Sequence, residues 1–283
     1  MTIAVYIPQG PLALFVDKLW YMQADSLPLR GINLPMLHTE LIVNFSEHFT
    51  IQQADGQSLV RDQVSWVSGL QTIPSRSQTA GQHEAMGALL KPWGLYSLTG
   101  IPTRTFANRA VAAYDLFGSD FRDVVERLQD TPDKHEKLKL LNAFLVSRYA
   151  DRDIPAFLFY ASQYLHSQPF RDGIVGDLCA YLRISRKSLN EAFQKYMGLS
   201  TSQFVRLNRF RKATDSIAKG PTRKLTEIAY EHNFFDQAHF NRLFNDFAGM
   251  TPGNFQKAVK CGLVEPFEQS EQPVSPAFVK EPA

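Results

Sequence analysis

The chain has 283 residues, of which 44% are apolar and 20% are charged, so it is long and apolar enough for two folded domains and is not mainly disordered. No apolar run reaches the roughly 18 residues that a membrane-spanning helix needs. The N-terminal segment has no basic start and is interrupted by Pro8, Gly10 and Pro11, so it predicts no signal peptide. Cys179 and Cys261 have neither the spacing of a metal site nor that of a disulfide framework. The composition therefore favours a cytoplasmic protein without a membrane partner.

The formal net charge of +2 is unevenly distributed along the chain. Residues 171–260 hold 15 Lys and Arg against 8 Asp and Glu, a balance of +7. The other 193 residues hold 15 against 20, a balance of −5, and the two parts sum to +2. A basic segment beside an acidic remainder indicates that the C-terminal part meets a polyanion.

Short strands are predicted in the first third of the chain. The segments 17–23, 40–46 and 58–69 alternate apolar and polar side chains or are rich in β-branched residues. Turn-forming residues at 27–35 and 54–57 separate them. We therefore expect a β-rich N-terminal part, followed by helices after "KPWG" at 91–94.

A helix is predicted over 131–149, with Thr131 as its N-cap. Leu138, Leu141 and Leu145 repeat on one face of this helix at i, i+3 and i+7. Such a stripe packs more often inside its own chain than against a second copy. A homodimer through residues 131–149 is nevertheless an open alternative.

Three segments are expected. Residues 1–150 form a regulatory, effector-sensing domain, and a polar break with a proline at 149–157 ends it. Residues 155–260 form an all-helical domain with short turns. Residues 261–283, rich in Pro and Glu, form a disordered tail. The expected fold class is α+β.

The helical part contains an internal repeat of residues 177–204 in residues 227–255. Leu178 aligns with Ile228 at an offset of 50, and Phe193 aligns with Phe244 at an offset of 51. The second copy therefore has one extra residue in its turn. Two copies are too few for a solenoid, so we interpret the repeat as a duplicated small helical unit.

Each copy has the pattern of a helix-turn-helix. A first helix is followed by a turn that ends in a capping residue, Ser185 or Asp236. A second helix then places two apolar residues four apart on its inner face and ends at Gly198 or Gly249, which suit a left-handed C-terminal position. The phenylalanines of the second copy that fall on inner positions therefore belong to the core, namely Phe234, Phe240, Phe244, Phe247 and Phe255.

The outward faces of the two second helices carry side chains that can reach base edges. Arg and Lys suit guanine, Asn and Gln suit adenine, and Glu suits cytosine. The first copy presents Arg186, Lys187, Asn190, Glu191 and Gln194, and the second presents Gln237, Ala238, Asn241, Arg242 and Asn245, with His239 at the edge.

A connecting helix is predicted over 202–218. Its length of about 17 residues spans roughly 25 Å. With the width of the flanking units added, it can hold two reading helices about one DNA turn, ~34 Å, apart. Its outer side is expected to be basic and to contact phosphates. The phosphate contacts predicted here are Arg206, Arg209, Arg211 and Lys212, with Arg186 in the first copy.

Residues 228–255, "IAYEHNFFDQAHFNRLFNDFAGMTPGNF", resemble the signature of the AraC/XylS family of bacterial transcription regulators. The resemblance covers 171–260 and implies two helix-turn-helix units joined by a long helix, in a sequence-specific DNA-binding regulator or activator. It implies base contacts from Lys187, Asn190, Glu191, Gln237, His239, Asn241 and Arg242.

The family pattern differs from this chain at two kinds of position. Family members usually have Gly in the two turns, where this chain has Arg183 and Asn233. Asn adopts the left-handed backbone more readily than Arg. They also usually have a small polar residue in place of Phe235, and a basic residue is common in place of Glu191.

Four segments of the N-terminal half are "WYMQ" at 20–23, "LIVNFS" at 41–46, "VSGLQTIP" at 67–74 and "KPWGLYSLTGIPTRTFANRAVAAYDLFG" at 91–118. Through them, residues 1–150 resemble the cupin-like β-barrel sensors that precede AraC-type domains. The resemblance implies an unknown small-molecule effector, with double-stranded DNA and RNA polymerase as partners. The alternative is a cupin-like metal-binding enzyme or sensor fused to the DNA-binding part. Its candidate ligands would be His38, Glu40, His48, His83 and Glu84, but the His-x-His spacing of metal cupins is missing. We therefore expect no enzyme activity, no metal and no cofactor.

Overall fold

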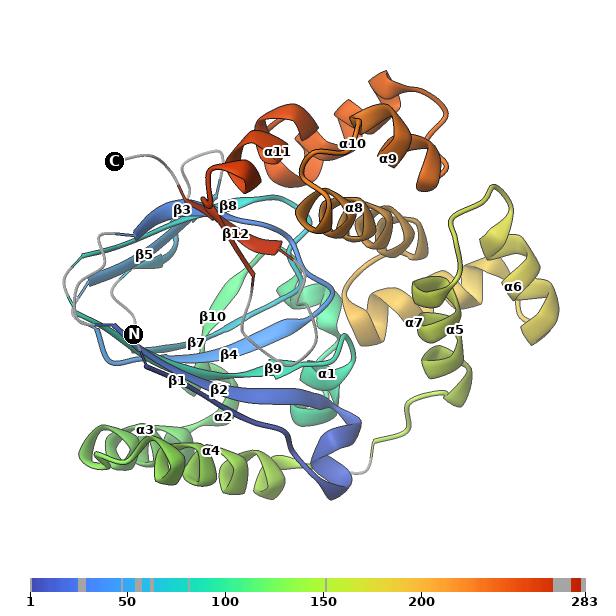
Figure 1. Ribbon diagram of the computed structural model, residues 1–283. Coiled ribbons are helices and arrows are strands. Elements are labelled where there is room, and N and C mark those ends of the chain that lie inside the picture. Colours follow the sequence, from blue (N-terminus) through green and yellow to red (C-terminus); the bar gives the residue numbers. More distant parts are fainter. Residues whose placement is uncertain are drawn as a thin grey trace.

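The computed structural model describes residues 2–24, 29–46, 48–53, 58–61, 64–80, 82–150, 152–266 and 276–280. Two antiparallel sheets form most of the N-terminal part, helices follow in the C-terminal part, and the last two strands of the chain return to the second sheet (Figure 1). The α+β prediction is confirmed. Within the described residues, no helix combines the length and apolar character needed to cross a membrane.

The first sheet has the strand order β1-β2-β9-β4-β7-β10, and all its neighbouring strands are antiparallel. One face of β2 and β9 holds Leu19, Met86 and Leu90, which are fully buried. The elements of this region are β1 (Thr2–Tyr6), η1 (Gly10–Leu14), β2 (Val16–Ala24), β4 (Thr39–Asn44), β7 (Ser65–Ser68), β9 (His83–Leu90) and β10 (Ala110–Ala112).

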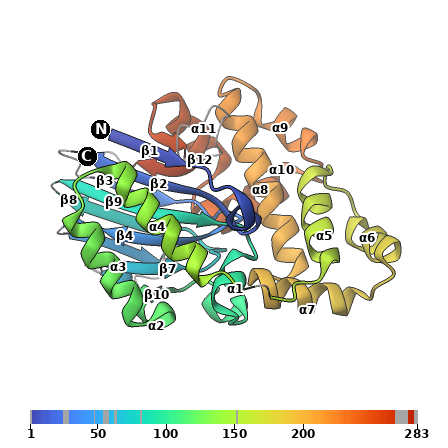
Figure 2. The same ribbon diagram turned by 90° about the horizontal axis from the view of Figure 1, so that it is seen from below.

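Helices α2 (Ala113–Phe117), α3 (Ser119–Asp130) and α4 (Lys134–Arg148) cover the outer face of this sheet (Figure 2). The leucine stripe of α4 faces the sheet and is buried, so it is core and not a dimer seam. The predicted N-cap is wrong. Asp133 caps α4 by accepting hydrogen bonds from the N–H groups of His135 and Glu136, because its carboxylate lies one residue before the helix.

The second sheet has the order β11-β12-β3-β8-β5-β6 and lies opposite the first (Figure 1). The predicted disordered tail is wrong for residues 261–266 and 276–280, because β11 pairs with β12, and β12 pairs with β3 and places Val279 beside Ile32. Val279 is buried, and its burial holds the strand against the helical part. Residues 267–275 and 281–283 lie outside the described residues. The strands are β3 (Leu29–Asn33), β5 (His48–Gln53), β6 (Ser58–Arg61), β8 (Ser75–Ala80), β11 (Val264–Pro266) and β12 (Pro276–Lys280).

Two successive three-helix units lie on either side of one long helix in the C-terminal part (Figure 1). The first unit comprises α5 (Ala156–Ser167), α6 (Ile174–Leu182) and α7 (Arg186–Met197). The long helix is α8 (Thr201–Lys219). The second unit comprises α9 (Leu225–Glu231), α10 (Gln237–Ala248) and α11 (Pro252–Lys260). Two short elements, α1 (Gly94–Thr99) and η2 (Thr103–Phe106), link the first sheet to α7.

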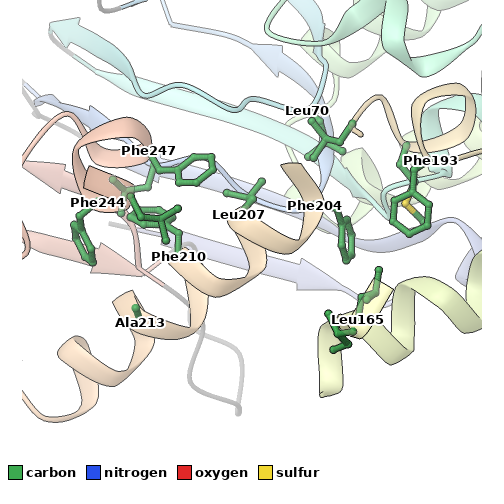
Figure 3. Packing of buried hydrophobic residues seen from close by; sticks show 14 of the residues in the cluster. Leu70, Leu165, Phe193, Phe204, Leu207, Phe210, Ala213, Phe244 and Phe247 are labelled. Atoms are coloured by element: carbon green, nitrogen blue, oxygen red, sulfur yellow. The ribbon is translucent and has the colours of Figure 1, made fainter. Parts of the chain in front are cut away.

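One apolar core runs along α8 and joins both units to the second sheet. Phe204 packs edge-to-face on Phe193 of α7, and Phe210 packs on Phe244 and Phe247 of α10 (Figure 3). Leu34, Leu70 and Val279 contribute to the same cluster from the N-terminal part and β12. Helix α8 is therefore surrounded by protein on several sides.

A hydrogen bond ties the N-terminal part to the first helical unit, and a close approach of Pro74 to Gly249 brings it to the second. The hydroxyl of Thr103, which is fully buried, donates to the main-chain oxygen of Tyr196 at 3.0 Å. A Cβ on Gly249 would lie 3.4 Å from the side chain of Pro74. A rearrangement of the two sheets would therefore displace the C-terminal ends of α7 and α10.

Candidate nucleic-acid interface

The capping predictions of both units are confirmed. Ser185 accepts a hydrogen bond from the N–H of Ser188 at the start of α7, and Asp236 accepts one from the N–H of His239 at the start of α10. Gly198 and Gly249 adopt the left-handed conformation at the ends of these helices. The repeat in the sequence is thus a repeat in local geometry.

The two turns use the left-handed backbone without glycine. Arg183 has φ of 54° and Asn233 has φ of 56°. The Asn233 side chain also donates to the main-chain oxygen of Phe170 at 2.8 Å, so its amide is used as well as its backbone. Phe235 follows in the second turn with 89% of its surface exposed, unlike the buried Phe234 beside it.

Helix α10 presents most of its predicted contacts to solvent. Gln237 and Arg242 are exposed, while Asn241 and His239 are half-buried at the edge of the same face. The ring of His239 packs against that of Phe234 with centroids 5.4 Å apart. Burial, followed by the charges of Arg209 and Arg242, lowers the pKa of His239, which favours the neutral imidazole.

Helix α7 presents a smaller polar face than predicted. Arg186, Lys187 and Glu191 are exposed, and the Lys187 Nζ lies 3.9 Å from a Glu191 carboxylate oxygen. Asn190 is half-buried, and its Oδ1 accepts a hydrogen bond from the N–H of Thr201 at 3.1 Å. That contact ties α7 to the start of α8, so the acceptor of Asn190 is engaged within the protein.

The predicted phosphate contacts are wrong for Arg209 and Arg211, each with only 5% of its surface exposed. Burial lowers the pKa of both guanidinium groups to about 10, so both stay charged at neutral pH. Arg209 lies between the rings of Phe170 in the first unit and Phe234 in the second. Arg211 lies near His38 of the N-terminal part. The basic outer face predicted for α8 is therefore largely covered.

The other two predicted basic residues of α8 lie nearer to solvent. Arg206 is exposed and pairs with Asp246 of α10, with an N···O distance of 2.6 Å. Lys212 is half-buried and donates to the main-chain oxygen of Gln168 at 3.0 Å. Arg206 and the exposed Arg186 thus retain the accessibility that a phosphate contact requires.

Residues 178–258, which contain both α7 and α10, match the family described as a helix-turn-helix domain. The C-terminal part of the chain is an AraC-type helix-turn-helix domain. Residues 4–112 match a different family, described as a domain of unknown function. This match places the N-terminal part in a family but assigns no function to it.

The relatives of the AraC-type domain are HTH-type regulators. YfiF, an HTH-type transcriptional regulator of Bacillus subtilis (strain 168), is 30% identical over 112 residues, which are 38% of this chain and 34% of YfiF. RhaR, an HTH-type transcriptional activator of Yersinia pseudotuberculosis serotype O:1b (strain IP 31758), is 28% identical over 83 residues, 29% of this chain and 28% of RhaR. The chain spans about a third of the length of the curated relatives it matches.

Two solved structures are similar to the chain over most of its length. ToxT of Vibrio cholerae O395 bound to (E)-4-(8-methylnaphthalen-1-yl)but-3-enoic acid has a TM-score of 0.48 and 13% identity, over 84% of this chain and 97% of its own. The AraC-like transcriptional activator CuxR has a TM-score of 0.32 and 12% identity, over 73% of this chain and 84% of its own.

The metal-ligand candidates ahead of the AraC-type domain have other partners. Glu84 accepts hydrogen bonds from Lys137 at 3.0 Å and from the Tyr21 hydroxyl at 3.1 Å. Glu40 accepts one from the Trp20 indole. No group of three or more His, Cys, Asp or Glu side chains in the described part of the chain could hold a metal ion.

The remaining candidates are histidines. The ring of His83 is buried beside Phe49, and its Nδ1 lies 3.1 Å from the Ser46 hydroxyl. The side chain of His48 lies outside the described residues. His38 is half-buried, and burial, together with the charges of Arg211 and Lys18, lowers its pKa to about 3.

Acid should destabilise the fold through His38. Its folded-state pKa lies below the ordinary 6.5, so between pH 6.5 and 3 the unfolded chain binds a proton that the folded chain does not, and stability falls as the pH falls. We expect the loss of unfolding free energy between pH 7 and 4 to be about 1–3 kcal/mol smaller in His38→Gln than in the unmodified chain.

Urea denaturation at a series of pH values measures this difference. His135→Gln, which changes an exposed histidine of α4, is the matched control. It should leave the slope of unfolding free energy against pH unchanged. Burial also lowers the pKa of His83, His166 and His232, so part of the slope should remain in His38→Gln. Identical slopes for the unmodified chain and His38→Gln would contradict the assignment.

Proposed function

We propose that this protein is a sequence-specific, DNA-binding transcription regulator that acts in the cytoplasm and is not an enzyme. Its C-terminal part, 155–260, binds double-stranded DNA, and its N-terminal part, 1–150, senses a small-molecule effector. The observation that carries the proposal is the pair of capped helices, α7 and α10, set on either side of α8 with exposed polar faces. Two such helices, held by one rigid connector, suit two successive major grooves.

Base reading is assigned to the exposed side chains of both helices. Arg and Gln on α10 offer bidentate hydrogen bonds to guanine and adenine. On α7, Lys187 and Glu191 offer a donor and an acceptor. Asn190 is withdrawn from the predicted readers because it holds α8. The proposed readers are Lys187, Glu191, Gln237, His239, Asn241 and Arg242.

Phosphate binding is assigned to Arg186 and Arg206, aided by the N-terminal N–H groups of the helices. Each phosphate contact releases counterions bound to the DNA, so affinity falls as the salt concentration rises. Arg206 would exchange its ion pair with Asp246 for a phosphate. The exchange costs little because an exposed ion pair contributes little to stability.

Regulation by an effector is supported by the core that the two parts share. Leu34, Leu70 and Val279 pack into the cluster that holds α8, and Thr103 bonds the end of α7. An effector that favours one arrangement of the sheets would therefore bias the orientation of the reading helices, a coupling of about 1–3 kcal/mol.

A homodimer through residues 131–149 would use the outer face of α4. Its leucine stripe is occupied by the sheet, but Val146 is exposed and a shallow cavity of about 490 Å³ lies between α3 and α4. RNA polymerase is the other proposed protein partner, as a transcription activator requires.

Selection of bound duplexes from a random pool tests the proposal. We expect the full chain to enrich a motif with two half-sites whose centres are about 10 base pairs apart. Affinity for the enriched duplex should exceed that for random DNA by roughly 10³-fold or more. Enrichment of no motif would overturn the assignment.

A further inference from the structure

Arg209 lies at the centre of α8, where both helix-turn-helix units approach the connector. Its guanidinium carbon is 4.0 Å from the ring centre of Phe170, in the loop between α5 and α6. On the other side it is 3.7 Å from the ring centre of Phe234, in the turn before α10. One planar cation is thus enclosed by an aromatic ring from each unit, an arrangement that favours Arg over Lys.

The hydrogen bonds of Arg209 are made to the second unit. Its Nε donates to the main-chain oxygen of His232 at 2.9 Å, and its Nη2 donates to that of Asn233. These carbonyls belong to the end of α9 and the left-handed turn residue. Buried charge-assisted bonds of this kind are strong and directional, so they hold the turn in one orientation relative to α8.

Neighbouring contacts hold the loop of the first unit against the same place. The amide of Asn233 donates to the main-chain oxygen of Phe170, which joins the two units directly. From α8, Asn208 donates to the main-chain oxygen of Leu165 at 2.8 Å, and Lys212 donates to that of Gln168. The two units therefore contact each other directly beside Arg209, where Asn233 of the second unit bonds the main chain of Phe170 of the first.

We infer that Arg209 is a positioning residue that fixes the separation and relative orientation of the two helix-turn-helix units. The inference rests on the proposed function only for its consequence, namely that both reading helices meet DNA in one register. Two binding units joined at a fixed distance gain affinity through their effective concentration, and the gain disappears when the geometry does not match the site.

Arg209→Met tests the mechanical claim without DNA. Spin labels at Ala180→Cys in α6 and Lys257→Cys in α11, both exposed positions, report the distance between the units. Cys261→Ser removes the exposed native thiol, and Cys179 is buried. Pulsed dipolar spectroscopy should give one narrow distance distribution for the unmodified chain and a distribution at least about twice as wide for Arg209→Met.

Two further variants separate this role from loss of charge or of folding. Lys219→Met removes one exposed positive charge at the end of α8 and should keep the narrow distribution. Phe170→Ala removes one aromatic face while Arg209 keeps its hydrogen bonds, and it should widen the distribution with an unchanged circular dichroism spectrum. A narrow distribution in both Arg209→Met and Phe170→Ala would overturn the inference.

DNA binding supplies the second measurement, on duplexes from the random-pool selection. Arg209→Met should bind the two-half-site duplex at least about tenfold more weakly, yet bind a duplex with one scrambled half-site as well as the unmodified chain does. Inserting two base pairs between half-sites should weaken the unmodified chain and scarcely affect Arg209→Met. Equal sensitivity to the insertion would overturn the inference. If the unmodified chain binds no DNA selectively, the proposed function fails, and the spin-label distances still decide the role of Arg209.

Discussion

Phe210→Ala should lower the free energy of unfolding by about 3–5 kcal/mol. Phe210 is fully buried in the middle of α8, with its ring centre 5.1 Å from that of Phe244 and 5.2 Å from that of Phe247. Truncation removes both aromatic contacts and leaves a cavity that the connecting helix cannot close without moving. The second helix-turn-helix unit should therefore lose its attachment to α8, and DNA binding should be lost with it.

Chemical denaturation followed by circular dichroism measures the loss. Phe235→Ala is the matched control, since it makes the same substitution at a ring that is almost wholly exposed. We expect that control to change stability by no more than about 0.5 kcal/mol. A loss of less than about 1 kcal/mol in Phe210→Ala would mean that the core along α8 does not hold the two units together.

The helix-turn-helix units were predictable because their signals are local. Ser185 and Asp236 cap the helices that follow them, and Gly198 and Gly249 end those helices, all within a few residues of the apolar pattern they delimit. Because the sequence repeats, each cap and each terminal glycine was supported by its counterpart in the other copy. The buried phenylalanines followed from the same periodicity, since a residue at the inner position of both copies has to meet the core.

The surroundings of α8 were not predictable in the same way. Arg209 and Arg211 lie on parts of the helix that a single amphipathic pattern assigns to solvent. Phe170 and Phe234 nevertheless cover Arg209, and Arg211 is buried near His38. Periodicity describes one helix and one inner stripe. It does not show that a second layer, distant in sequence, packs on the opposite side.

The C-terminal strand was missed for a related reason. Residues 276–280 are flanked by Pro and Glu, a composition that predicts a tail. Their pairing with β3 joins positions almost 250 residues apart, and no local pattern records such a partner. Asp133 was missed as the cap of α4 because Thr131, two residues earlier, already formed an adequate start signal.

Arg242→Ala should weaken binding to the selected duplex by about 1–3 kcal/mol and relax its preference at one base pair. Arg242 is exposed on α10, and its pattern of donors matches the O6 and N7 acceptors of guanine in the major groove. A base contact acts on one sequence and leaves random DNA unaffected. A phosphate contact would instead weaken both and reduce the salt slope by about 1.

Competition binding with duplexes substituted at each position distinguishes these outcomes. Lys219→Ala, which removes an exposed positive charge outside the proposed contacts, should leave the order of preference among the duplexes unchanged. If Arg242→Ala lost the same affinity for selected and random DNA, then Arg242 would be a backbone contact. The specificity of the second unit would then have to come from Gln237, His239 and Asn241, two of which are half-buried at the edge of the face.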